Sequence, residues 1–263
     1  MLQIVTLAAA ILLGQGSSEL TLSKARFTYG ELGPVRPDNK FLPGDAVFLS
    51  FDISGIKTSE IGAYSYVLTI DVQDKAGKSV FKKSVDFDGI LPLGGNKLRA
   101  NPHLILPNDQ VPGDYKFNLT VLDKGTKVSK TISKEFTLLP KAFGLVALQI
   151  SNDDKGLQST PLDGTVGEVR FLNFSVANFA RDNKKKPNFE IELQIFEGNK
   201  PIYSKPFVDK VNDIFDEKIN NYPAIFRIFL NREGKFTVSI KAIDHIAKKT
   251  SEYQLPLEVH PAK

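Results

Sequence analysis

Residues 113–121 read GDYKFNLTV, and this stretch decides the fold of the chain. Its aromatic and aliphatic residues alternate with polar ones. Because successive side chains of a β-strand point to opposite faces, the alternation predicts a strand with one buried and one hydrated face. Residues 234–242 read GKFTVSIKA and alternate in the same way. The chain is therefore expected to contain the same kind of strand twice.

The two stretches belong to a longer internal repeat. Residues 44–51 (GDAVFLSF) match residues 167–174 (GEVRFLNF) at an offset of 123, whereas the strands quoted above match at an offset of 121. The offset changes only once the middle of the unit is crossed, as the loss of two loop residues would cause. We interpret this pattern as an internal duplication.

Short segments of the same character recur in both copies, and turn residues separate them. No stretch carries apolar residues at helical spacing over three turns. About seven short strands in about 110–120 residues are typical of an antiparallel sandwich. We therefore predict an all-β chain of two tandem antiparallel β-sandwich domains, at residues 19–140 and 141–263. Further strands are expected at residues 20–27, 45–53, 66–72, 79–87 and 127–138, with counterparts at 145–150, 168–176, 189–196, 201–207 and 251–259.

Residues 111–121 (VPGDYKFNLTV) resemble the entry to strand F of immunoglobulin-like and fibronectin type III-like domains. The resemblance implies that the Tyr115 hydroxyl bonds to the backbone across the corner before the strand. Phe236, at the matching place in the second copy, has no hydroxyl and cannot do so. The chain lacks Cys and Trp, which excludes an antibody-type core. The resemblance implies a fold and a broad habit of binding or spacing, and no particular activity.

The N-terminus has the pattern of an export signal. Residues 4–13 read IVTLAAAILL, and small residues follow, with Gly14 and Gly16 at suitable places before a cleavage site. Ten residues span about 15 Å as a helix, which is too short to cross a bilayer core of about 30 Å. We predict a signal peptide at residues 1–16, no membrane span after its removal, and a periplasmic or secreted mature chain. A buried first strand or helix is the alternative.

Composition excludes several classes of function. The absence of Cys rules out disulfides, thiolate metal sites and cysteine nucleophiles. The 263 residues include 34 basic and 30 acidic side chains, which are interspersed and give a net charge of +4. A nucleic-acid-binding protein usually gathers its positive charge on one face or tail, so no nucleic-acid partner is predicted.

Candidates for catalytic or metal chemistry are few. The histidines are His103, His245 and His260, and we expect them to be solvated or packed. No Gly-x-Ser-x-Gly motif is present. Acidic residues cluster at Asp71, Asp74, Asp86 and Asp88, and again in the turn at residues 152–154. Asp and Asn favour turns by bonding their own backbone, so structural turns are the first interpretation and calcium binding is the alternative.

Two acids recur at one place in both copies, Asp123 and Asp244, and turn closure after the strand explains them. The basic run at residues 184–186 has no counterpart in the first copy and is expected to be a solvated loop tip. Tyr64 and Tyr66 could stack on a sugar, but the alternation around Tyr66 favours the core.

The sequons at Asn118 and Asn173 fall inside predicted strands. They matter only if the host glycosylates its proteins.

No catalytic residue and no cofactor is predicted, and a metal site is left open. The leading interpretation is a non-enzymatic exported binding, adhesion or spacer protein with a protein or cell-surface polymer as its partner. The alternative is a hydrolase, or an accessory subunit such as a carbohydrate-binding one, of a secreted enzyme.

Overall fold

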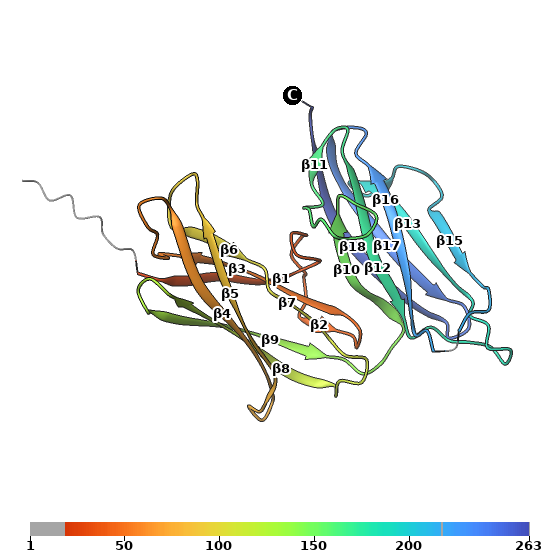
Figure 1. The fold of residues 1–263 in the computed structure, drawn as a ribbon. Helices are drawn as coiled ribbons and strands as arrows, with labels where there is room; N and C mark the ends of the chain where they lie inside the picture. Colours follow the sequence, from red (N-terminus) through yellow and green to blue (C-terminus); the bar gives the residue numbers. More distant parts are fainter. Residues whose placement is uncertain (1–18, 217, 263) are drawn as a thin grey trace, which may run out of the picture.

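The computed structural model describes residues 19–216 and 218–262, so the predicted signal peptide lies outside the described residues. These residues form eighteen strands and no helix, and they build two β-sandwiches that follow one another along the chain (Figure 1). Within the described part, no helix is long and apolar enough to cross a membrane.

The first sandwich has a small and a large sheet. The small sheet has the order β1 (Thr21–Thr28), β3 (Ala46–Ser54) and β6 (Lys97–Ala100), with β7 (His103–Ile105) also paired to β3. The large sheet has the order β2 (Lys40–Phe41), β9 (Ser129–Leu138), β8 (Gly113–Asp123), β4 (Ala63–Asp74) and β5 (Ser79–Ile90).

The second sandwich repeats this plan. Its small sheet has the order β10 (Gly144–Ser151), β12 (Val169–Ala177) and β16 (Asn221–Phe229). Its large sheet has the order β11 (Gly164–Thr165), β18 (Lys249–His260), β17 (Gly234–Asp244), β13 (Phe189–Glu197) and β14 (Lys200–Pro201), with β15 (Phe207–Val211) also paired to β13.

The two sandwiches share one topology, with β6 and β7 in the place of β16 and β5 in the place of β14 and β15, which confirms the all-β tandem-sandwich prediction and the duplication. Even an irregularity is repeated. The register slips within β1 and within β10, and Lys24 and Ala147, 123 residues apart, have positive φ angles of 57° and 55° there. All strand pairs are antiparallel except two short parallel ones, β2 with β9 and β11 with β18.

The alternation of apolar and polar residues in the sequence matches the alternation of buried and exposed side chains along the strands. In β8, Phe117, Leu119 and Val121 are fully buried, whereas Lys116 is exposed. Sequence reasoning found most of the long strands but missed β16 and the short β2, β6 and β11, and it merged β14 and β15 into one strand at residues 201–207. In the structure the strand is interrupted between Pro201 and Phe207. Pro206 lies in this gap, and its backbone nitrogen has no hydrogen to donate to a neighbouring strand.

The core of the first sandwich is made by residues between Leu20 and Leu138, and that of the second by residues between Leu145 and Val259. Tyr29, from the loop after β1, is the exception, since it packs into the second core. The boundaries 19–140 and 141–263 themselves stay a prediction.

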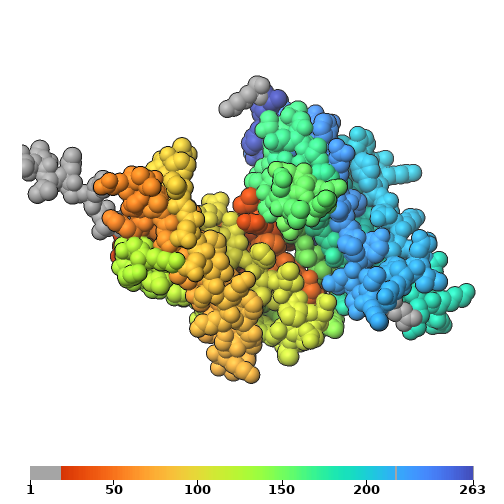
Figure 2. All heavy atoms as spheres, viewed as in Figure 1, coloured from red at the N-terminus to blue at the C-terminus, as the bar shows by residue number. Residues whose placement is uncertain are grey.

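A buried joint connects the two sandwiches. Arg36 donates from Nη1 to Asp45 Oδ2 at 2.9 Å, and its guanidinium lies 5.0 Å from the Tyr29 ring centre and 5.9 Å from that of Tyr253 in the second sandwich. Asp45 Oδ1 accepts the backbone N–H of Ala147, also in the second sandwich, at 2.7 Å. Figure 2 shows the loop after β1 (orange-red) against the second sandwich (green). A buried ion pair therefore lies where the two sandwiches meet.

Candidate binding groove

The three histidines lie apart from one another in the structure. His103 lies on β7, where its ring packs 5.2 Å from that of Phe48 in the first sandwich. His245 follows β17 and His260 ends β18, at opposite ends of the same pair of strands. In the described part of the chain, no three His, Cys, Asp or Glu residues gather as a metal would require.

The acidic turns use their carboxylates to bond backbone. Asp74 Oδ1 accepts the N–H groups of Ala76 and Lys78, each at 2.9 Å. Asp153 accepts backbone N–H groups of its own loop, including those of Leu157 and Gln158, and these bonds hold the pKa of its carboxyl below the usual value. Hydrogen-bonded turns of this kind are what the structural interpretation requires.

Of the remaining acids of the first cluster, Asp71 accepts from Ser79 Oγ at 2.6 Å and Asp86 pairs with Lys124. Asp88 lies on β5 opposite Ser65.

Asp123 and Asp244 accept equivalent backbone hydrogen bonds in the two copies. Both side chains are fully buried. Asp123 accepts the N–H of Lys57 at 2.8 Å, and Asp244 accepts that of Ala180, the residue at the matching position, at 2.7 Å. Each also accepts N–H groups of its own turn, among them that of Gly125. They therefore tie the end of one strand to the loop after another.

Tyr66 belongs to the core rather than to an exposed platform. Only 5% of its surface is exposed, and its ring stacks on Phe87 at 5.0 Å and lies 6.1 Å from that of Tyr64. Burial, with a smaller contribution from Tyr64, raises the pKa of Tyr66 to about 12. A buried ring of this kind offers no face to a sugar.

The other singled-out residues lie on strands or at a loop tip. Asn118 is on β8, where Ser133 donates to it, and Asn173 is on β12, where it donates to Ser151. Residues 184–186 form a hairpin tip in which the Asp182 carboxylate accepts backbone N–H groups.

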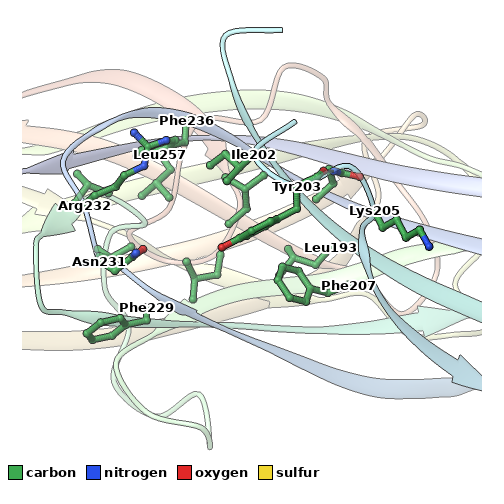
Figure 3. Close-up of a pocket in the computed structure, with 15 residues that line it drawn as sticks. Leu193, Ile202, Tyr203, Lys205, Phe207, Phe229, Asn231, Arg232, Phe236 and Leu257 are labelled. Atoms are coloured by element: carbon green, nitrogen blue, oxygen red, sulfur yellow. Dashed lines mark hydrogen bonds between the residues drawn. The ribbon is translucent and has the colours of Figure 1, made fainter. Parts of the chain in front are cut away.

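An apolar groove opens at the outer edge of the second sandwich, between β16 and the segment that joins β14 to β15 (Figure 3). Its floor is made by core side chains, among them Leu193 and Ile228. Three aromatic side chains stand around it, Tyr203, Phe207 and Phe229, and they are 64%, 58% and 56% exposed. The groove holds about 160 Å³.

Beside the groove, the edge strand of the large sheet is interrupted. Ile202 N–H donates to the Ile195 carbonyl at 2.9 Å, and Gln194 Nε2 donates to the Tyr203 carbonyl at 2.6 Å. Regular pairing with β13 resumes only at Phe207. The intervening residues therefore arch away from the sheet and leave the side chains beneath them uncovered.

Two cations stand at the ends of the groove. In Figure 3 the Tyr203 ring lies across the groove, with Arg232 towards one end and Lys205 towards the other. Arg232 lies 4.7 Å from the centre of the Phe236 ring and donates to Glu197 at 2.8 Å. No carboxylate is among the described residues that line the groove. The middle of the groove is apolar, Lys205 places a cation at one end, and Arg232, paired with Glu197, lies at the other end.

Sequence reasoning did not single out the aromatic residues of this groove. A usable signal is present in Pro201 and Pro206, which bracket the aromatic Tyr203. Proline within an apparent strand indicates an edge or a break.

No family model and no curated protein matches the chain. Solved structures do. The C-terminal domain of the AgI/II polypeptide BspA from Streptococcus agalactiae is 9% identical, with a TM-score of 0.31 over 89% of this chain and 99% of that one. The C-terminal domain of the antigen I/II-family protein AspA from Streptococcus pyogenes is 9% identical, with a TM-score of 0.32 over 91% and 99%.

A family 123 glycoside hydrolase from Clostridium perfringens is 11% identical, with a TM-score of 0.32 over 46% of this chain and 27% of that one. Likeness at this level carries no argument about what the chain binds.

Proposed function

We propose that the chain is a non-enzymatic exported binding protein whose contact surface is the groove of the second sandwich. The observation that carries the proposal is the trio of exposed rings, Tyr203, Phe207 and Phe229, around an apolar floor. Large aromatic side chains contribute strongly to association when a partner buries them, and contiguous exposed apolar surface typically marks an interaction site.

The size of the groove favours part of a large partner over a whole small ligand. Pockets for drug-sized ligands measure about 300–1,000 Å³, whereas this groove holds about 160 Å³. That is room for side chains or a single ring, presented by a protein or a cell-surface polymer. The joint at Arg36 and Asp45 supports a binding role as well, because it holds the groove in a fixed orientation relative to the first sandwich.

Site-specific photocrosslinking in the native host tests the proposal. A benzophenone amino acid placed at Phe229 preserves an aromatic side chain, and the matched control carries it at Lys134, an exposed residue of the first sandwich. We expect a discrete adduct from position 229 and none from position 134. Equal adducts from both positions, or none from either, would contradict the proposal.

The second candidate is an accessory carbohydrate-binding subunit of a secreted enzyme. Tyr203 and Phe207 favour it, since their rings are exposed and lie 6.0 Å apart at 82°. Mass spectrometry of the adduct from position 229 separates the two candidates, because one predicts a crosslinked peptide and the other a crosslinked glycan.

Export is the remaining part of the proposal. It is supported by the apolar run at residues 4–13 and the small residues after it. N-terminal sequencing of the native protein should find a chain that begins near Ser17 in the periplasm or the medium. A folded cytosolic protein that retains Met1 would show that the run is not a signal.

A further inference from the structure

We propose that the groove receives an extended segment of a partner protein, which joins the free edge of β16 as an additional strand. The segment would place apolar side chains in the groove and carboxylates near its two ends. This inference rests on the proposed function and specifies the partner of the same site.

β16 offers a free sheet edge beside the groove. It pairs with β12 along its whole length and is the last strand of its sheet, so its outer backbone groups face no other strand of the described chain. Pro223, which has no N–H group to donate, hinders the addition of a strand only near the start of β16. From residue 224 to 229 the strand exposes Ile225 and Phe229, with Arg227 between them as its one charged side chain. Such an edge is a template for an added strand.

The position of an added strand follows from sheet geometry. Neighbouring strands lie about 4.8 Å apart, and every second side chain points to the same face. A strand beside β16 would therefore lie over the opening between β16 and β15, and its inward side chains would enter the groove. Leu193 and Ile228 would meet them from below, and Tyr203 would meet them from the side.

The cations around the groove favour a partner segment with carboxylates at its two ends. Lys205 and Arg232 stand at opposite ends of the groove, and Arg227 adds a third exposed cation on β16. The Arg232–Glu197 pair is about half exposed on both sides, so a partner carboxylate can compete for the guanidinium at little cost. An apolar centre flanked by carboxylates is the complement of this pattern.

A labelled nine-residue probe peptide tests the charge pattern by fluorescence anisotropy with the purified chain. Its sequence is Asp-Thr-Val-Thr-Phe-Thr-Val-Thr-Asp, so that the Asp, Val and Phe side chains share one face of the strand. We expect saturable binding, and binding weaker by roughly tenfold when both Asp are replaced by Lys. Equal binding of the two peptides would overturn the charge assignment.

Protein variants locate the binding. Phe229→Ser should reduce affinity by about tenfold or more, whereas Ile105→Ser, at the equivalent exposed position of the first sandwich, should leave it unchanged. Both side chains are exposed, so both variants should fold. Equal loss in the two variants would overturn the assignment to this groove.

Two N-methylated peptides test the strand itself. Alternate residues of a strand direct their N–H groups to opposite sides, so methylation of one alternate set blocks pairing with β16 and methylation of the other set does not. We expect one methylated peptide to bind like the parent and the other to lose binding. If both bind equally, strand addition is wrong while the proposed function stands.

The state of the free chain completes the test. A dimer or longer oligomer that dissociates on Phe229→Ser would identify a second copy as the occupant and would overturn the assignment to a partner protein. If no peptide binds and position 229 yields no crosslink, both this inference and the proposed function fail.

Discussion

The outer edges of the two sandwiches differ although the strands behind them match. In the first sandwich β5 runs for twelve residues without a break, and exposed charges at Lys82, Lys83, Asp86 and Asp88 line it. In the second sandwich the same edge consists of β14 and β15 with an arch between them. Charged, continuous edges resist pairing with other chains, whereas an interrupted edge exposes what lies beneath. The duplicated framework was thus kept while its edge diverged.

The two copies also differ at the corner that precedes β8 in the first sandwich and β17 in the second. In the first copy the Tyr115 hydroxyl donates to the Val111 carbonyl at 2.5 Å and accepts from Gln110 at 2.8 Å, as the resemblance implied. In the second copy Phe236 replaces the tyrosine, and Arg232 lies over its ring. The first copy thus has a tyrosine hydrogen-bonded to the backbone at this corner, whereas the second copy has a phenylalanine ring with a guanidinium over it.

Core truncation should give the largest effect. Phe117→Ala removes a fully buried ring from the first sandwich and should cost about 3–5 kcal/mol, from lost transfer free energy and the remaining cavity. The neighbouring Lys116→Ala should change stability little, because that side chain faces water. Thermal unfolding of both variants measures this, and equal shifts would show that the alternation does not describe the core.

The joint between the sandwiches comes next. Asp45→Asn should destabilise the chain by about 3 kcal/mol, because it removes the buried counter-charge of Arg36 and leaves only the half-exposed Asp38 at 3.7 Å, while the amide oxygen still accepts from Ala147. Glu168→Gln is the matched control in the second copy, since the Glu168 side chain is half exposed and should contribute at most about 1 kcal/mol. Denaturant titrations compare the two, and an equal cost would mean that the joint is not a distinctive feature of the first copy.

The tyrosine corner should have a smaller effect. Tyr115→Phe removes the hydrogen bond to the Val111 carbonyl and the one from Gln110, and should cost about 1 kcal/mol, confined to the first sandwich. It also makes this corner like that of Phe236 in the second copy. An unchanged unfolding midpoint would mean that the corner hydrogen bond adds nothing to the stability of the first copy.

A local pH effect should be the smallest. Backbone N–H groups lower the pKa of Asp153 from its ordinary value of 3.8, so the ionised carboxylate stabilises the fold above that value and loses this effect as the pH falls through the lowered pKa. The matching residue of the first copy is Gly30, which has no such group. NMR titration should give a midpoint below 3.8 for Asp153, and Asp153→Ala should flatten the pH dependence of stability in this acidic range.

Strands with one buried face could be predicted because their residues alternate. The burial pattern of β8 and β17 follows the sequence directly, and the repeated offset aligned the two copies. β16 escaped prediction for a physical reason. It carries Pro223 and exposes the apolar Ile225 and Phe229 on its outer face, so polar and apolar positions do not separate along it.

By itself, the sequence determined the all-β class, the duplication and the turn-closing role of Asp123 and Asp244, because these depend on spacing within one strand or between copies. Only the tertiary structure decided that Tyr203 and Phe229 line one groove and that Arg36 is buried against the second sandwich. Those features depend on which segments face each other across two sheets and on where pairing with β13 stops. Contacts between residues far apart in the chain leave no periodic signal in a single sequence.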